Sequence, residues 1–186
     1  TSNANALLIQ GAHGNTQQLD SIPFSFGSTQ EDNRPCNCTV NGLEELGYFL
    51  DQARSPTKGL TYIASAMGGH GRRCKDNALP SNLLRFDIDG STAYKGAPLS
   101  NADFERFKAV YQGISRILYP SSSDKEEARR FRQILLLDIA ISRQDSMRLG
   151  KHLASLTPWV ELGEQVFRHE QPIFCPVGDA QVQVIH

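Results

Sequence analysis

Long hydrophobic runs are missing from this sequence of 186 residues. No apolar stretch approaches the roughly 20 residues that a membrane-spanning helix needs. The first residues also lack the basic flank and apolar core of a secretory signal peptide. These absences predict a cytoplasmic protein with no membrane partner. Ser2 to Ala4 resemble a tag-cleavage remnant, and we expect the chain to be part of a longer protein.

Cysteine is scarce, with four residues at Cys36, Cys38, Cys74 and Cys175. One residue separates the first two, whereas paired zinc ligands are usually separated by two to four residues. A zinc site made of Cys36, Cys38, Cys74 and His70 stays open as an alternative. Reduced cysteines, which are the rule in the cytoplasm, are the simpler interpretation.

An excess of positive charge is missing too, because 19 Lys and Arg face 20 Asp and Glu, for a net charge of −1. The net charge therefore gives no sign of a nucleic-acid partner. Basic residues are nevertheless clustered in "GRRCK" (71–75) and "ARRFR" (128–132). Such clusters either contact phosphate groups or form a solvated surface. If the first one contacts DNA, the contacts are Arg72, Arg73 and Lys75.

The hydrophobic pattern predicts strands that alternate with helices. Strands are expected at 6–11, 59–69, 81–89, 129–141 and 171–177, and helices at 40–55, 100–119 and 142–156; residues 24–40 are turn-rich, with alternation at the edges. This order favours an α/β or α+β fold with a mixed sheet flanked by helices. The length predicts a single domain over 1–186, with a strand–helix region at 1–60 and a core at 60–178.

The helix expected at 100–119 has the clearest pattern. Ser100 is a good N-cap, with Asp103 three residues later. The apolar stripe consists of Phe104, Phe107, Tyr111, Ile114 and Leu118.

Two acids end the apolar run "NLLRFDIDGS" (82–91). Residues two apart in a strand point to the same face, so Asp87 and Asp89 project together, about 7 Å apart at Cα. Two such carboxylates can bind a hard cation such as Mg²⁺, and without a cation they repel each other. The alternative is an Asp-Gly turn at the strand end. That alternative accounts for Asp89 and Gly90 but not for Asp87.

A second apolar run, 129–141, carries Asp138, and counting back in twos places Arg132 and Arg130 on the same face. If this strand neighbours the first, Asp138 completes a three-carboxylate cluster with Asp87 and Asp89. The arginines then meet a triphosphate, which a planar guanidinium suits. Three acids, divalent cations and arginines are the components of two-metal nucleotidyl transfer.

Other enzymes also use two aspartates one residue apart. "FDIDGS" resembles the first motif of haloacid-dehalogenase-type phosphatases, but the later acidic pair that those enzymes need is missing. Nucleotide-sugar transferases share the spacing, but no other segment supports them.

The order of these segments resembles the primase–polymerase domain of the archaeo-eukaryotic primase superfamily, in the version carried by plasmids, phages and integrative elements. The matching segments are "LLRFDIDG", a long helix, "LYPSSS", "RRFRQILLLDIAIS", another helix and "QPIFCPV". The resemblance implies an RRM-like core and a DNA primase or polymerase. Its partners would be single-stranded DNA template, nucleoside triphosphates and a fused or separate helicase.

The resemblance also implies residue roles. Mg²⁺ or Mn²⁺ would be bound by the three acids, and the triphosphate would be contacted by Arg130, Arg132, Ser121 and Ser123. The family has a Ser-x-His motif after the long helix, where this chain has "SSSD" (121–124) without histidine. Two functions therefore stay open: a primer-making enzyme, and a non-catalytic module that binds DNA or a replication partner.

Overall fold

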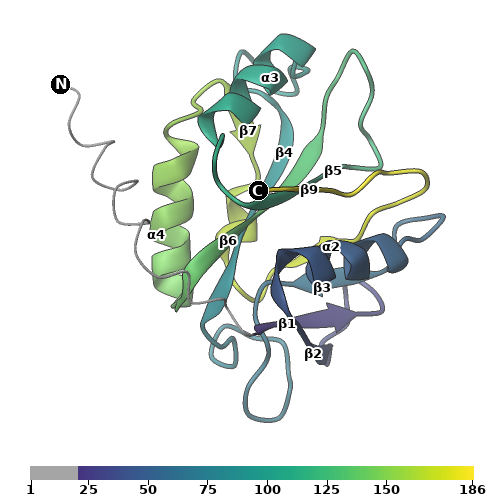
Figure 1. The fold of residues 1–186 in the computed structure, drawn as a ribbon, viewed down its shortest axis with the longest axis vertical. Coiled ribbons are helices and arrows are strands. Elements are labelled where there is room, and N and C mark those ends of the chain that lie inside the picture. Colours follow the sequence, from purple (N-terminus) through teal and green to yellow (C-terminus); the bar gives the residue numbers. More distant parts are fainter. Residues whose placement is uncertain (1–20) are drawn as a thin grey trace.

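The computed structural model describes residues 21–186, so the strand expected at 6–11 lies outside the described residues (Figure 1). Within 21–186 the strands form two sheets, and all paired strands run antiparallel. The predicted α+β class is confirmed, although a single mixed sheet was expected. In the described part, no helix is both long and apolar enough to cross a membrane.

The first sheet has the order β2-β1-β3-β8. Its strands are β1 (Ile22–Gly27), β2 (Cys36–Val40), β3 (Thr61–Ile63) and β8 (Pro172–Phe174). Helix α2 (Gly42–Gln52) confirms the helix expected at 40–55. A side chain at Gly47 would come within 2.5 Å of Val184. Glycine at this position therefore lets α2 approach the edge of the second sheet.

The second sheet has the order β7-β4-β6-β5-β9. Its strands are β4 (Ser81–Ser91), β5 (Arg116–Pro120), β6 (Phe131–Ile141), β7 (Val160–Leu162) and β9 (Gln183–Ile185). Helix α3 (Asn101–Val110) joins β4 to β5, and α4 (Arg143–Ala154) joins β6 to β7. This βαββαβ order is a split βαβ arrangement, as an RRM-like core requires. In Figure 1, α4 lies on the left and the first sheet on the lower right.

The prediction of a long helix at 100–119 is correct for its first half and wrong for its second half. Its start is as predicted, since the Ser100 hydroxyl accepts a hydrogen bond from the Asp103 backbone N–H at 3.1 Å. The helix ends at Val110, and Gly113 then takes a positive φ of 79°. Residues 116–120 form strand β5 between β6 and β9. Burial beside β6 suits this β-branched and aromatic segment better than a helix does.

Other strands differ from the sequence prediction mainly in length. The strands expected at 81–89, 129–141 and 171–177 are present as β4, β6 and β8, whereas 59–69 yields only the three residues of β3. Short strands β7 and β9 were missed because three residues carry too little alternation to be recognised. The edges of the turn-rich segment 24–40 form the hairpin of β1 and β2.

A buried arginine fixes the segment between β7 and β8, which includes the 3₁₀ helix η1 (Glu164–Phe167). Arg85 on β4 is 1% exposed and donates to the carbonyl oxygens of Val166 (3.0 Å), Arg168 (3.0 Å) and Gln171 (2.8 Å). Three carbonyl dipoles and the face of Tyr62, 5.7 Å away, compensate the buried charge. The segment is therefore tied to the middle of β4.

His169 in this segment is also buried, at 1% exposure, and its Nδ1 lies 3.2 Å from the Leu79 carbonyl oxygen. A carbonyl can only accept, so Nδ1 carries the proton and donates. Burial, with the positive charge of Arg85, lowers the pKa of His169 from 6.5 to about 4. The histidine is therefore neutral in the folded protein at neutral pH.

This histidine makes stability depend on acid pH. In the unfolded chain His169 takes up a proton as the pH falls below 6.5, whereas in the folded chain it stays neutral down to about pH 4. The free energy of unfolding therefore falls as the pH falls through this window. The loss should reach about 3 kcal/mol. His169→Asn keeps a donor for Leu79 and should remove this part of the loss, measured as urea-unfolding free energies at pH 7 and pH 4.5. The exposed control His70→Asn should behave like the parent, and equal pH losses in parent and His169→Asn would contradict this account.

Candidate functional site

A pocket of about 220 Å³ lies between the two sheets. Six of the residues singled out in the sequence line it together: Asp87, Asp89, Ser121, Ser123, Arg130 and Arg132. The acids come from β4 and Arg132 from the start of β6; Arg130 and the two serines come from the loop between β5 and β6. Pairing of β6 with both β4 and β5 brings these separate segments to one end of the sheet.

The two aspartates reach the same pocket from one strand, although a bulge between Ile88 and Gly90 shifts the pairing of β4 with β7. β4 runs on to Ser91, so the alternative of an Asp-Gly turn is wrong. Gly90 is buried, and a Cβ there would lie 2.5 Å from the Ala97 carbonyl oxygen. The glycine is therefore required by a close approach of backbone, and not by a turn.

The environment of Asp89 disfavours its charge. Burial and the neighbouring Asp87 raise its pKa, while Arg130 and Arg132 act in the opposite direction. A bound cation would relieve the repulsion between the two carboxylates.

Arg132 lies directly opposite Asp87 in the β4–β6 register and opposite Tyr119 in the β5–β6 register. Its Nε is 3.2 Å from Asp87 Oδ1, and the residue is 6% exposed. Nε has no aligned hydrogen bond, so this contact is an ion pair. Burial alone would lower the pKa of Arg132, but Tyr119 and Asp87 outweigh it and the pKa is raised. This guanidinium is charged and enclosed.

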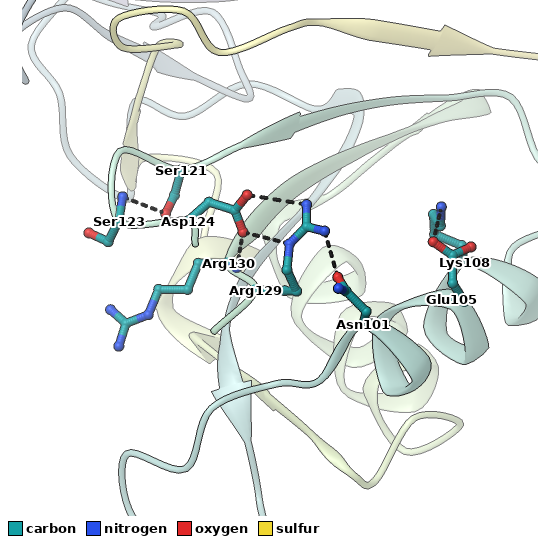
Figure 2. A network of polar contacts seen from close by, with 8 residues as sticks. All are labelled: Asn101, Glu105, Lys108, Ser121, Ser123, Asp124, Arg129 and Arg130. Carbon is teal, nitrogen blue, oxygen red and sulfur yellow. Dashed lines mark hydrogen bonds and ion pairs between the residues drawn. The ribbon is translucent and has the colours of Figure 1, made fainter. Parts of the chain in front are cut away.

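Arg130 differs from Arg132 because its guanidinium is free. Within residues 21–186 it makes no ion pair, and Figure 2 shows it extending away from the neighbouring polar cluster. That cluster holds the loop in place. The Asp124 carboxylate accepts from Arg129 Nε (3.1 Å), Arg129 Nη2 (3.2 Å) and the Arg130 backbone N–H (2.7 Å). Arg129 Nη1 also donates to Asn101 Oδ1 at 2.7 Å, which ties the loop to α3.

The two serines lie in the same loop. The Ser121 hydroxyl oxygen accepts a hydrogen bond from the Ser123 backbone N–H at 3.2 Å, a local turn that is visible in Figure 2. Ser121 is half-buried and Ser123 is exposed. Both hydroxyls can donate to a ligand in the pocket.

The expected third acid is not part of this site. β4 and β6 are antiparallel, so Asp87 faces Arg132 near the start of β6, and Ser81 faces Ile141 at its end. Asp138 comes six positions after Arg132, about 20 Å along the strand, and is exposed. The three-carboxylate cluster was therefore wrong. Across the described chain, no group of three or more His, Cys, Asp or Glu residues is placed to hold a metal ion.

The same finding removes the zinc alternative. Cys36 and Cys38 lie on β2, and His70 and Cys74 lie in the loop between β3 and β4, without forming a metal-binding group. All four cysteines are free thiols, and burial raises the pKa of Cys175 to about 12.

The basic cluster 71–75 lies in the loop between β3 and β4, at the bottom of the view in Figure 1. Its residues do not line the pocket. Arg72 and Lys75 are exposed, whereas Arg73 is half-buried and its backbone N–H donates to the Asn33 carbonyl oxygen at 2.8 Å. Their contact with DNA stays a prediction.

Several pocket residues were missed from the sequence. Lys58, in the loop before β3, brings a third cation, and its Nζ lies 5.5 Å from the centre of the Phe174 ring. The other polar residues are Gln30, Gln165 and Gln171. An isolated lysine or glutamine carries no sequence signal. The one usable signal was Arg85, a charged residue inside the apolar run before Asp87, which anchors the segment that carries Gln165 and Gln171.

No protein-family model matches the chain, and no curated protein matches it. Among solved structures, it is similar to the polymerase domain of Ligase D from Mycobacterium tuberculosis in complex with DNA. The TM-score is 0.45 and the identity 11%, over 83% of this chain and 57% of the other. The chain thus spans little more than half the length of that structure. A likeness this distant carries no argument for function, which rests on the pocket instead.

Proposed function

We propose that the chain is a metal-dependent nucleotidyl-transfer domain that makes or extends primers on single-stranded DNA in the replication of a mobile genetic element. The observation that carries this proposal is the pocket itself. Two carboxylates from one strand face meet two cations that have no ion-pair partner among residues 21–186, Arg130 and Lys58. Acids for a cation and cations for a polyphosphate are what phosphoryl transfer requires.

The donor set fits a magnesium or manganese ion. Mg²⁺ is usually bound through one or two carboxylates, with substrate phosphates and water completing its shell. Asp87 and Asp89 supply two carboxylates, and the raised pKa of Asp89, caused first by burial and then by Asp87, is what a site prepared for a cation would show. When bound, the ion supplies charge stabilisation to the transferring phosphoryl group.

The chain's own residues would bind and orient the nucleotide. Arg130 offers a planar guanidinium that suits a phosphate, and Lys58 offers a point charge from the loop before β3. Ser121 and Ser123 offer hydroxyl donors from a loop that Asp124 keeps in place. In this proposal the serine loop does the work of the family's Ser-x-His motif.

Template DNA would be bound mainly through its phosphates. The loop with Arg72, Arg73 and Lys75 provides a basic surface for it, and such binding is tolerant of sequence and weakened by salt. A helicase, fused or separate, would supply the single strand.

A second candidate is a non-catalytic module that binds DNA or a replication partner. Two observations favour it: Asp138 lies away from the pocket, and residues 121–124 contain no histidine. The phosphatase alternative gains no support, because no further acid joins Asp87 and Asp89 within the described residues.

Metal binding is tested by thermal unfolding with and without millimolar Mn²⁺. The parent should be stabilised, because an ion that binds the folded state alone raises the unfolding free energy, by about 2.7 kcal/mol at 100 times its dissociation constant. Asp87→Asn/Asp89→Asn should show no such shift. Asp138→Asn is the matched control and should respond like the parent, since Asp138 is exposed and distant. Equal shifts in the parent and the double variant would refute the metal site.

Catalysis is tested by primer synthesis and extension on single-stranded templates with Mn²⁺ or Mg²⁺. Asp89→Ala should abolish product, because the cation is lost, while DNA affinity stays within about threefold, because phosphate contacts are kept. Arg130→Ala should mainly raise the nucleotide KM, about tenfold, because it removes binding shared by ground and transition states. Asp138→Ala should retain activity. If the parent makes no product on any template, the binding-module function replaces this one.

A further inference from the structure

The two arginines of the pocket are in different physical states. Arg132 is enclosed and paired with Asp87 at 3.2 Å, with its side chain 7% exposed. Arg130, two positions earlier, is half-buried and its guanidinium has no ion-pair partner among the described residues. The two arginines therefore do not both suit the role of contacting a triphosphate.

The enclosure of Arg132 is built from three sides. β4 flanks it with Asp87, and β5 flanks it with Tyr119. Tyr119 is itself fully buried and fixed, since its hydroxyl donates to the Phe174 carbonyl oxygen at 3.0 Å. Tyr62, also fully buried, lies close enough to influence the charge of Arg132. Close packing on these sides prevents the guanidinium from swinging out toward a ligand.

The ion pair between Arg132 and Asp87 reduces the number of carboxylate oxygens that are available to a metal ion. One Asp87 oxygen faces Arg132, which leaves the second Asp87 oxygen and the two oxygens of Asp89. Glu161 on β7 lies near enough to raise the pKa of Asp89, but within the described residues it does not join the two aspartates in a group that could hold a metal ion. Two Mg²⁺ ions would have to share these three oxygens, with water and phosphate filling the rest of both coordination shells. They would also place two divalent charges beside a buried guanidinium.

We propose that Arg132 is a built-in counter-cation of Asp87, and that the pocket therefore binds one divalent cation and not two. Asp89 and the free oxygen of Asp87 hold this ion. The triphosphate is met by Arg130 and Lys58, not by Arg132. This inference rests on the proposed metal-dependent function.

The number of bound ions is the first test. Free Mn²⁺ is counted by electron paramagnetic resonance during titration of the full chain, alone and with an equimolar non-hydrolysable nucleoside triphosphate analogue, at concentrations where the chain binds all of the analogue, because free analogue itself binds Mn²⁺. One Mn²⁺ per chain is expected in both series. Two ions in the presence of the analogue would overturn the counter-cation inference and leave the proposed function standing. No bound Mn²⁺ in either series would overturn the proposed function as well.

Variants then separate the two arginines. Arg132→Gln should bind Mn²⁺ about tenfold more tightly, because a buried like charge is removed and an Asp87 oxygen is released. Arg132→Lys keeps the charge and should stay within about threefold of the parent; if Arg132→Gln does not fold, the Mn²⁺ count of the parent decides the matter. Arg130→Gln is the matched control. Its Mn²⁺ affinity should stay within about threefold of the parent, and its triphosphate affinity should be about tenfold lower. Loss of triphosphate affinity in Arg132→Gln with unchanged Mn²⁺ affinity would overturn the inference.

Discussion

The antiparallel pairing of β4 with β6 is the constraint on which the site depends. This register sets Asp87 against Arg132 and carries the loop of Ser121 and Ser123 to the acids through β5. The same register sends Asp138 to the far end of the sheet. One set of backbone hydrogen bonds therefore decides which charged residues meet and which do not. A shift by one residue would turn every side chain of β6 to the other face, so the register and the site cannot change independently.

One face of β4 carries charges at alternate positions, and each is compensated differently. Arg85 is satisfied by three carbonyl oxygens, Asp87 by a buried guanidinium, and Asp89 by neither. The charges on β4 thus have fewer compensating partners the closer they lie to the pocket. Removing one partner of a buried ion pair typically costs about 3–5 kcal/mol, so the pair of Asp87 with Arg132 also stabilises the structure, whereas Asp89 has no such partner.

Much of this arrangement was predictable from local pattern. Asp87 and Asp89 were recognised because two acids inside an apolar strand oppose burial, and the cap Ser100 marked the start of its helix correctly. Asp138 was misplaced because face periodicity says nothing about strand direction or register. Residues 116–120 were taken for helix because their apolar spacing fits both periods, and only pairing with β6 selects the strand. Lys58 was missed because it reaches the pocket through the packing of two sheets, which no local pattern encodes.

Charge balance also fits the proposed one-ion pocket. Three cations, Lys58, Arg130 and Arg132, face two carboxylates, so the pocket carries one net positive charge. One divalent ion raises this excess to three, which the roughly four negative charges of a nucleoside triphosphate neutralise. A second ion would raise it to five, which exceeds the charge of the triphosphate and adds repulsion with the buried Arg132. The glutamines around the pocket add donors and acceptors without charge. Under the one-ion proposal, the buried Arg132 provides, as a permanent part of the fold, positive charge that a second ion would otherwise bring.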